Sequence, residues 1–292
     1  MNLEIKNLTK KYSSNKFGLN NYSLNISSGI LGLLGPNGAG KSTLIKIISS
    51  ISKPTKGNIF LDGNDILKNP NYIRRILGYL PQDFGVYPNL NAYEFLEYIA
   101  AMKGIGGKNV RKKIVCLLEE VNLIDVAKNQ LGTYSGGMKQ RIGIAQALLN
   151  DPKIIIFDEP TVGLDPEERL HFRDLISDLA NDRIIILSSH IVSDIETIAD
   201  EVAIMKNGEL VIKNTQEDIV KQMQGKVFET TVNLSNIKNF KSYHRVVSSF
   251  RSQNTFKVRY VNETNTENSQ EVEATLEDAY IYLTKNENYV SI

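Results

Sequence analysis

Short, wholly apolar runs alternate with longer stretches of mixed polarity over roughly the first 220 residues of the chain. The runs at 30–34, 154–157 and 184–187 carry no polar side chain, which is typical of strands buried on both faces of a sheet. The stretches at 44–48 and 167–179 have apolar residues at helical spacing. Buried strands that alternate with helices predict an α/β fold.

Further short strands are bounded by turn-forming residues, and we expect them at 3–5, 22–26, 58–61, 76–80, 202–205 and 209–212. The polar run at 10–14 predicts a loop. From 91 to about 131 the spacing is mostly helical, with Gly104, Gly106 and Gly107 as the main break. These residues predict a helical insertion at about 84–140 within the alternating pattern.

The composition changes after about Gln224. Residues 226–292 are polar, with strand-like runs at 227–232 and 256–261 and a helix candidate at 275–284. We therefore expect a domain over 1–224 and a small α+β accessory domain over 225–292. The accessory region contains no motif that indicates a chemistry.

Composition restricts the function classes. The chain has 292 residues, 41% of them hydrophobic, and a net charge of +1. A near-neutral charge gives no general electrostatic case for binding nucleic acid or an anionic membrane. No apolar run approaches the ~20 residues of a membrane span, and the N-terminus lacks a signal-peptide core. Cys116 stands in an apolar run and is expected to be a buried thiol in a reducing compartment.

A glycine-rich stretch between an apolar run and a helical pattern fits the phosphate-binding loop G-x-x-x-x-G-K-[ST] at every fixed position. Its glycines allow positive φ angles, so successive backbone N–H groups can face an anion. The following helix adds the positive end of its dipole. The lysine would reach the β- and γ-phosphates, and the serine would bind Mg²⁺. The residues are Gly35, Pro36, Asn37, Gly38, Ala39, Gly40, Lys41, Ser42 and Thr43.

Polar residues stand where several predicted strands end. Asp158 and Glu159 directly follow the apolar run at 154–157, while Gln82 and His190 follow two other strands. Open α/β sheets bind ligands at the carboxyl ends of their strands. We expect Asp158 to hold Mg²⁺ through water and Glu159 to activate an attacking water as general base.

Two weaker signals have ordinary alternatives. Ser135, Gly136 and Gly137 precede a helical pattern, where they could bind an anion or simply cap the helix. Tyr12 could stack on a nucleotide base, but most tyrosines simply pack.

Taken together, the motifs over roughly residues 1–220 resemble the ATP-binding subunit of an ABC transporter. The phosphate loop matches the Walker A motif and Asp158 the end of Walker B. The other matches are Tyr12 with the aromatic residue that stacks on adenine, Gln82 with the Q-loop, Ser135-Gly136-Gly137 with the signature, Glu159 with the catalytic glutamate, Asp165 with the D-loop and His190 with the switch histidine.

The resemblance implies an ABC-type P-loop ATPase domain with a mixed sheet, using ATP and Mg²⁺. Two ATPase subunits would pair head to tail, each ATP lying between one Walker A loop and the other subunit's signature. Ser42, Gln82 and Asp158 are then the metal residues. His190 orients the γ-phosphate and the attacking water, and Gln82 relays to a membrane partner.

The signature departs from the commonest form, because Tyr134 and Met138 replace a leucine and a glutamine. This variant is similar to an ABC-2 branch that exports drugs, antibiotics and lantibiotics. The resemblance thus implies a peripheral subunit on the cytoplasmic face of the membrane, with a separate permease and either a second copy or a sister ATPase. We expect the permease to dock on the helical insertion, at a surface rich in aromatic residues. The alternative is that these residues fill the core of the insertion itself. The residues are Phe84, Tyr87, Pro88, Tyr93 and Tyr98.

Other classes stay open. A soluble ABC ATPase acting on ribosomes or DNA is disfavoured by the single set of motifs, by the short segment between Ile48 and Gln140, and by the neutral charge. An importer ATPase is disfavoured by the small C-terminal region and by the signature with Tyr134 and Met138. A non-catalytic subunit is disfavoured by Glu159 and His190. The sequence names no cargo.

Overall fold

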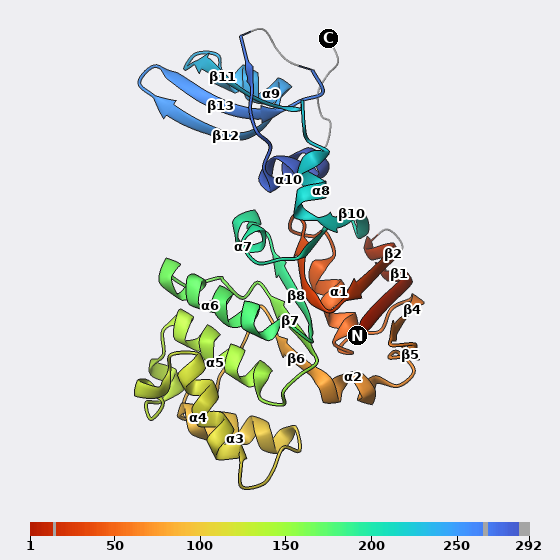
Figure 1. The fold of residues 1–292 in the computed structure, drawn as a ribbon, viewed down its shortest axis with the longest axis vertical. Helices are drawn as coiled ribbons and strands as arrows, with labels where there is room; N and C mark the ends of the chain where they lie inside the picture. The colour runs from red at the N-terminus through yellow and green to blue at the C-terminus, as the bar shows by residue number, and fades with distance from the viewer. Residues whose placement is uncertain (14–15, 265–267, 286–292) are drawn as a thin grey trace.

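The computed structural model describes residues 1–13, 16–264 and 268–285, and arranges them around three sheets (Figure 1). The first sheet is antiparallel. Its strands, in spatial order, are β2 (Lys16–Ser27), β1 (Asn2–Ser13), β4 (Lys56–Leu61) and β5 (Asn64–Asp65). The prediction of a loop at 10–14 is wrong for residues 10–13, which continue β1 and pair with β2; position 14 lies outside the described residues.

The second sheet carries the predicted buried strands. Neighbouring strands are parallel except for β10, which pairs antiparallel with β9 at one edge. The α/β fold with a mixed sheet is therefore confirmed. In spatial order its strands are β10 (Glu209–Thr215), β9 (Glu201–Lys206), β3 (Gly29–Leu34), β8 (Ile184–Ser189), β7 (Ile154–Asp158) and β6 (Leu77–Leu80).

The second sheet separates two apolar cores. In β7, Ile154 and Ile156 face the first sheet together with α1 (Lys41–Ile48), whereas Ile155 and Phe157 face the helices on the other side. Successive side chains of a strand point to opposite faces, so a continuously apolar strand fills both cores at once. This explains why the wholly apolar runs were reliable strand signals.

The helical segment begins just before β6 and continues between β6 and β7. Its helices are α2 (Pro70–Ile76), just before β6, then α3 (Ala92–Met102), α4 (Val110–Glu120) and α5 (Gly136–Leu148), with single 3₁₀ turns at Ile124–Val126 and Leu131–Thr133. Asn91 and Glu94 form a reciprocal capping box at the start of α3. The prediction of a buried Cys116 is wrong: the thiol is exposed, because Leu117 and Leu118 turn into the core and Cys116 falls on the outer face of α4.

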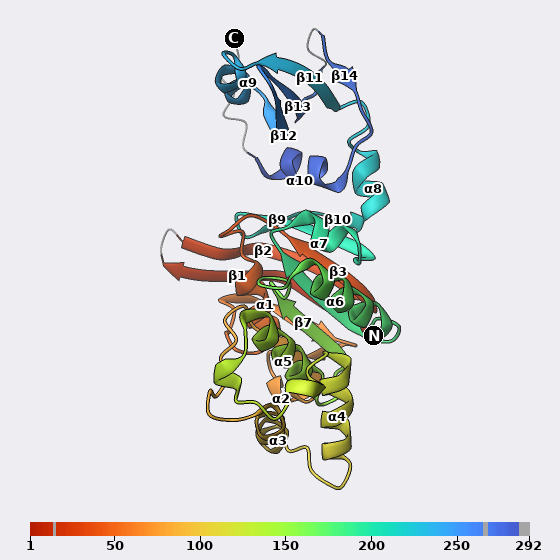
Figure 2. The same cartoon turned by 90° about the vertical axis from the view of Figure 1, so that its left-hand side faces the viewer.

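The third sheet is antiparallel and lies beyond β10 (Figures 1 and 2). Its strands, in spatial order, are β12 (Arg245–Ser252), β13 (Thr255–Val261), β11 (Val227–Asn233) and β14 (Gln270–Glu271). The remaining helices are α6 (Pro166–Leu179), α7 (Val192–Glu196), α8 (Gln216–Lys221), α9 (Ile237–Tyr243) and α10 (Leu276–Thr284). In Figure 2, α10 lies between this sheet and β9.

Helix α10 joins the third sheet to the rest of the molecule. It packs against α7 and β9, and its Leu276 and Ala279 belong to the same buried cluster as Ile195 of α7. The predicted domain boundary between residues 224 and 225 stays a prediction, because one apolar core contains residues from both sides of that boundary. Residues 286–292 of the proposed accessory domain lie outside the described residues. Within the described residues, no helix is both long and apolar enough to cross a membrane.

Candidate functional site

The predicted phosphate loop connects β3 to α1, as the motif requires. Gly40 has φ 108°, and a Cβ there would lie 2.4 Å from the carbonyl oxygen of Gly18. Only glycine combines that backbone angle with that close approach. Gly38 also has a positive φ, 82°, but open space around it. The loop is therefore held against the β1–β2 hairpin by backbone contact.

Lys41 opens α1 and is only 6% exposed. Its Nζ donates to the carbonyl oxygen of Gly35 at 2.5 Å. Burial lowers the pKa of Lys41, and the charges of Glu159 and Asp158 partly oppose that shift. A buried cation held against the loop's own carbonyl is ready to exchange that contact for a phosphate oxygen, which is a stronger, charged acceptor.

A cavity of about 570 Å³ lies above the phosphate loop. It brings together residues of the first sheet and of the segments that directly follow β6, β7 and β8. Its lining contains most of the predicted site residues, with Gly35 buried beneath them. The predicted residues that line it are Tyr12, Pro36, Asn37, Gly38, Ala39, Gly40, Lys41, Ser42, Thr43, Gln82, Glu159 and His190.

Asp158 and Glu159 are linked through a residue that the sequence reasoning missed. The Ser188 hydroxyl, fully buried at the end of β8, donates to Asp158 Oδ1 at 2.6 Å. Ser188 Oγ in turn accepts from the backbone N–H of Glu159 at 3.2 Å. The sequence signal was available, since polar residues follow the apolar part of this strand just before His190.

Glu159 and His190 form a contact at the edge of the cavity. Glu159 has φ 56°, a left-handed angle that is uncommon outside glycine, and its carboxylate Oε2 lies 2.6 Å from His190 Nδ1. An ionised carboxylate only accepts hydrogen bonds, so Nδ1 carries the proton. The His190 side chain is 48% exposed while Glu159 is almost buried, so the pair joins the interior to the open face of the cavity.

Tyr12 lies at the rim, 55% exposed, and its hydroxyl is 3.2 Å from Thr43 Oγ1. Strand pairing places Phe17, a lining residue that the sequence reasoning missed, on the neighbouring strand and 45% exposed. Two exposed aromatic rings beside a phosphate loop suit the flat face of a nucleotide base. The missed signal was a second aromatic residue in the same hairpin.

The signature and D-loop residues do not join this cavity. Ser135 caps α5 by accepting from the N–H of Met138 at 3.2 Å, and Asp165 caps α6 by accepting from Glu168 at 2.9 Å. Ser135, Gly136 and Asp165 are exposed, and Gly137 is half-buried beside them. Within this chain Ser135 and Asp165 therefore act as helix caps, and none of the four residues is among those that line the cavity.

The oxygen donors suit a magnesium ion only in part. Ser42 and Gln82 face the cavity, and Asp158 lies buried close enough to affect Lys41. No cluster of three acidic, histidine or cysteine side chains that could hold a metal occurs in the described ranges. Mg²⁺ in proteins takes one or two carboxylates together with substrate phosphates, so this donor set fits a metal that arrives with a nucleotide.

The family model and the most similar known proteins point to the same family. The family model described as "ABC transporter" matches residues 19–162. An uncharacterized ABC transporter ATP-binding protein, YxlF of Bacillus subtilis, is 38% identical over 79% of this chain and 76% of its own length. The linearmycin resistance ATP-binding protein LnrL of the same organism is 36% identical over 76% of this chain and 72% of its own. The bacitracin transport ATP-binding protein BcrA of Bacillus licheniformis is 42% identical over 72% and 68%.

Solved structures agree with the fold. A structure described as the ATP-binding subunit of an ABC transporter superimposes with a TM-score of 0.69 at 31% identity, over 76% of this chain and 93% of that one. A dimeric ATP-binding cassette bound to ADP and Pi, in a post-hydrolysis state, gives a TM-score of 0.68 at 29% identity, over 73% and 98%.

Proposed function

The chain belongs to the ABC transporter family as an ATP-binding subunit that hydrolyses ATP, and from this premise we propose that it powers export of drugs, antibiotics or peptides through a separate membrane permease. The observation that carries the proposal is the cavity that combines the phosphate loop with Glu159 and His190. It offers charge for the phosphates and a base for water in one space.

We assign the chemical roles from this geometry. The loop amides and Lys41 hold the β- and γ-phosphates, and Tyr12 with Phe17 hold the base. Glu159 takes a proton from the attacking water, and His190, fixed by its Nδ1 hydrogen bond, directs Nε2 toward the γ-phosphate. Mg²⁺ held by Ser42, Gln82 and Asp158 would neutralise phosphate charge.

Glu159→Gln tests the general-base assignment. The amide keeps the size of the side chain but cannot accept a proton, so kcat for ATP hydrolysis should fall by about 10²- to 10³-fold. ATP affinity, measured by equilibrium titration, should stay within a few-fold. Glu167→Gln, on the exposed first turn of α6, is the matched control. Hydrolysis at the unaltered rate in Glu159→Gln would refute the role.

We further propose that a second ATPase subunit supplies its signature to this cavity. Support comes from the position of the signature and D-loop residues outside the cavity lining, with Ser135, Gly136 and Asp165 exposed, and from the dimeric relative bound to ADP and Pi. Because ATP would lie between two chains, binding it should favour the dimer by mass action.

Size-exclusion chromatography tests the dimer. Glu159→Gln with ATP should elute as a dimer, and without ATP as a monomer. Adding Ser135→Arg should abolish the dimer while ATP binding persists. Thr133→Arg, on an exposed residue just before the signature, is the control that should still dimerise. A chain that stays monomeric with ATP would favour a sister ATPase as the pairing subunit.

The candidate permease surface divides into two parts. Tyr87 and Tyr98 are 52% and 42% exposed, and with Pro88 and Leu90 they line an apolar groove of about 440 Å³. Phe84 and Tyr93, in contrast, are half-buried and pack against the core. We propose that the permease docks in the groove at Tyr87 and Tyr98, which would hold this subunit at the cytoplasmic face of the membrane.

Affinity purification from membranes tests the permease and the export reading together. A tag on this chain should recover a polytopic membrane protein, and Tyr98→Asp should lose it, while Tyr72→Asp on exposed α2 should keep it. Recovery of ribosomes or nucleic acid instead would move the chain to the soluble class. The two relatives named for bacitracin transport and linearmycin resistance support export, and the recovered permease would identify the cargo class.

A further inference from the structure

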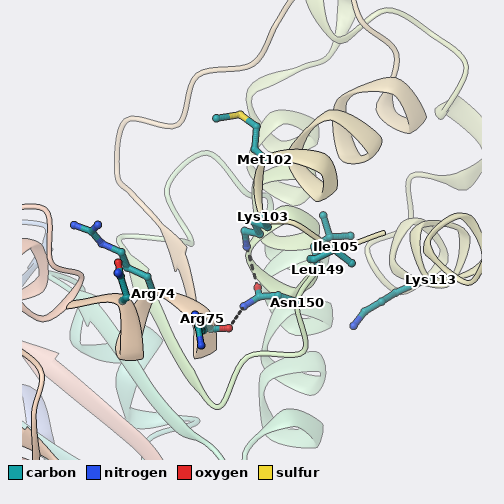
Figure 3. Close-up of a pocket in the computed structure, with 9 residues that line it drawn as sticks. Arg74, Arg75, Met102, Lys103, Ile105, Lys113, Leu149 and Asn150 are labelled. Atoms are coloured by element: carbon teal, nitrogen blue, oxygen red, sulfur yellow. Dashed lines mark hydrogen bonds between the residues drawn. The ribbon is translucent and has the colours of Figure 1, made fainter. Parts of the chain in front are cut away.

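A second cavity of about 570 Å³ lies away from the nucleotide site, where the ends of α2 and α3 meet α4 and the segment after α5 (Figure 3). Four cations are among its lining residues, and none of the lining residues is acidic. The residues are Asn71, Arg74, Arg75, Met102, Lys103, Ile105, Lys113, Leu149 and Asn150.

The four cations lack counter-charges. Across residues 1–13, 16–264 and 268–285, none of them forms a salt bridge. Glu97, an acid on α3 outside the lining, pairs with Arg111. In a chain with a net charge of only +1, an unpaired group of cations is a local feature that composition conceals.

The cations differ in how free they are. Arg74 points away from the cavity and donates to Ser50 (Figure 3). Lys103 donates to the carbonyl oxygen of Gln146 and to Asn150 Oδ1, at 3.1 and 2.9 Å. The side chains of Arg75 and Lys113 make no hydrogen bond within the described part of the chain. At least two donors thus remain for a ligand.

Asn150 organises the cavity floor. Its amide oxygen accepts from Lys103, and its Nδ2 donates to the carbonyl oxygen of Arg75 at 3.2 Å. These bonds tie α2 to the end of α3, so Arg75 and Lys103 come from elements that are fixed relative to one another. Lys103 is exposed, but desolvation by the groups around it, and then repulsion from Lys113, lowers its pKa to about 8. An anion between the two lysines would relieve that repulsion.

We propose that this cavity is a second anion site, which takes a phosphate group between Lys103, Lys113 and Arg75. Lysine and arginine together supply a point charge and a planar fork for phosphate oxygens. The apolar side chains of Met102 and Ile105 stand beside the cations. The phosphate belongs either to an anionic lipid headgroup or to a soluble phosphate compound.

The position of the second cavity at the end of α3 indicates which source of phosphate it would meet. Met102, 69% exposed, stands one helical turn after Tyr98 of the permease groove. A permease docked in that groove would bring the membrane surface near the second cavity. The proposal that the phosphate belongs to a lipid headgroup therefore rests on the proposed function. The site itself does not, because its residues are distinct from those of the nucleotide cavity.

Two binding assays on the full chain test the site. In the first, pyrophosphate is titrated calorimetrically with the nucleotide cavity saturated by ADP. In the second, the chain is floated with phosphatidylglycerol vesicles and, for comparison, phosphatidylcholine vesicles. The double variant Lys103→Gln, Lys113→Gln should weaken binding by about 25-fold, about fivefold for each lost charge. The matched pair Lys108→Gln, Lys112→Gln removes the same charge from exposed positions outside the lining.

Each outcome decides the matter. Selective loss in the cavity variant supports the site, and the assay that responds identifies lipid or soluble phosphate as the source. Binding of neither probe by the unaltered chain, or equal losses in both pairs, overturns it. If the double variant melts early, Arg75→Gln on α2 repeats the test. ATP hydrolysis should be unchanged in all of these variants, so failure here is distinguishable from failure of the ATPase assignment.

Discussion

The nucleotide cavity and the second cavity, called here the basic cavity because arginines and lysines line it, have the same volume of about 570 Å³. They differ in the groups that would bind an anion. The first would surround phosphate with backbone N–H groups whose positions depend on glycines such as Gly40. The second presents long side chains from separate helices, tied together by Asn150. A backbone site needs particular residues in consecutive order, so it leaves a motif. A side-chain site needs only charge at distant positions, so it leaves none.

The largest expected effect comes from distorting the backbone site. Gly40→Ala adds a Cβ 2.4 Å from the Gly18 carbonyl oxygen, at a φ that costs an L-residue about 1–2 kcal/mol. The loop must shift, and ATP affinity should fall about a hundredfold. Gly38→Ala shares the positive φ but meets no atom within 4 Å, so it should lose far less. Equal losses of ATP affinity in the two variants would show that the positive φ angle alone, and not the close approach to Gly18, determines binding.

A smaller effect is expected from the buried serine behind the carboxylates. Ser188→Ala removes the donor to Asp158 and one acceptor of the Glu159 N–H. Unfolding free energy should fall by about 1–3 kcal/mol, and kcat by about tenfold, with little change in ATP affinity. Ser189 is equally buried, and among the described residues its hydroxyl is hydrogen-bonded only to the Ile191 N–H, so Ser189→Ala should keep kcat. Steady-state kinetics and thermal melts of both variants decide this.

The next largest effect is a difference between the two cavities in how strongly salt weakens ligand binding. Exposed charges are screened within about 10 Å at 0.1 M salt, so pyrophosphate binding in the basic cavity should weaken several-fold between 50 and 300 mM sodium chloride. ATP binding should change less, since Lys41 is buried and the loop amides that would hold the phosphates carry no net charge. Equal slopes in parallel titrations would contradict the structural contrast.

The smallest effect concerns Lys103 without any ligand. Because its pKa is lowered to about 8, the unfolded chain holds more protons than the folded one between pH 8 and the ordinary lysine pKa. Stability should therefore rise with pH across that window. Solvent screening at this exposed side chain limits the gain to a few tenths of a kcal/mol, or about 1 °C in Tm. Lys103→Met should remove the rise, and Lys112→Met should leave it.

The comparison also explains how far the sequence could be interpreted. The wholly apolar strands and the residues at their carboxyl ends were predictable, because such strands fill two cores and their ends meet at one edge of the sheet. Ser188 and Phe17 were not singled out, since a lone serine or phenylalanine has many ordinary uses. Cys116 was misplaced because an apolar run in a helix still exposes one face. The basic cavity depends on tertiary proximity among residues from 71 to 150, which no local pattern encodes.

The packing of α10 has a consequence for how the chain is made. Residues of α7 emerge during synthesis well before α10, which begins at Leu276. Chains fold progressively from the N-terminus as they are synthesised, so the surface of α7 and β9 that α10 covers stays open to water and to other chains during that interval. The nascent protein can build its phosphate loop early, but it closes its apolar core only after the third sheet has been translated.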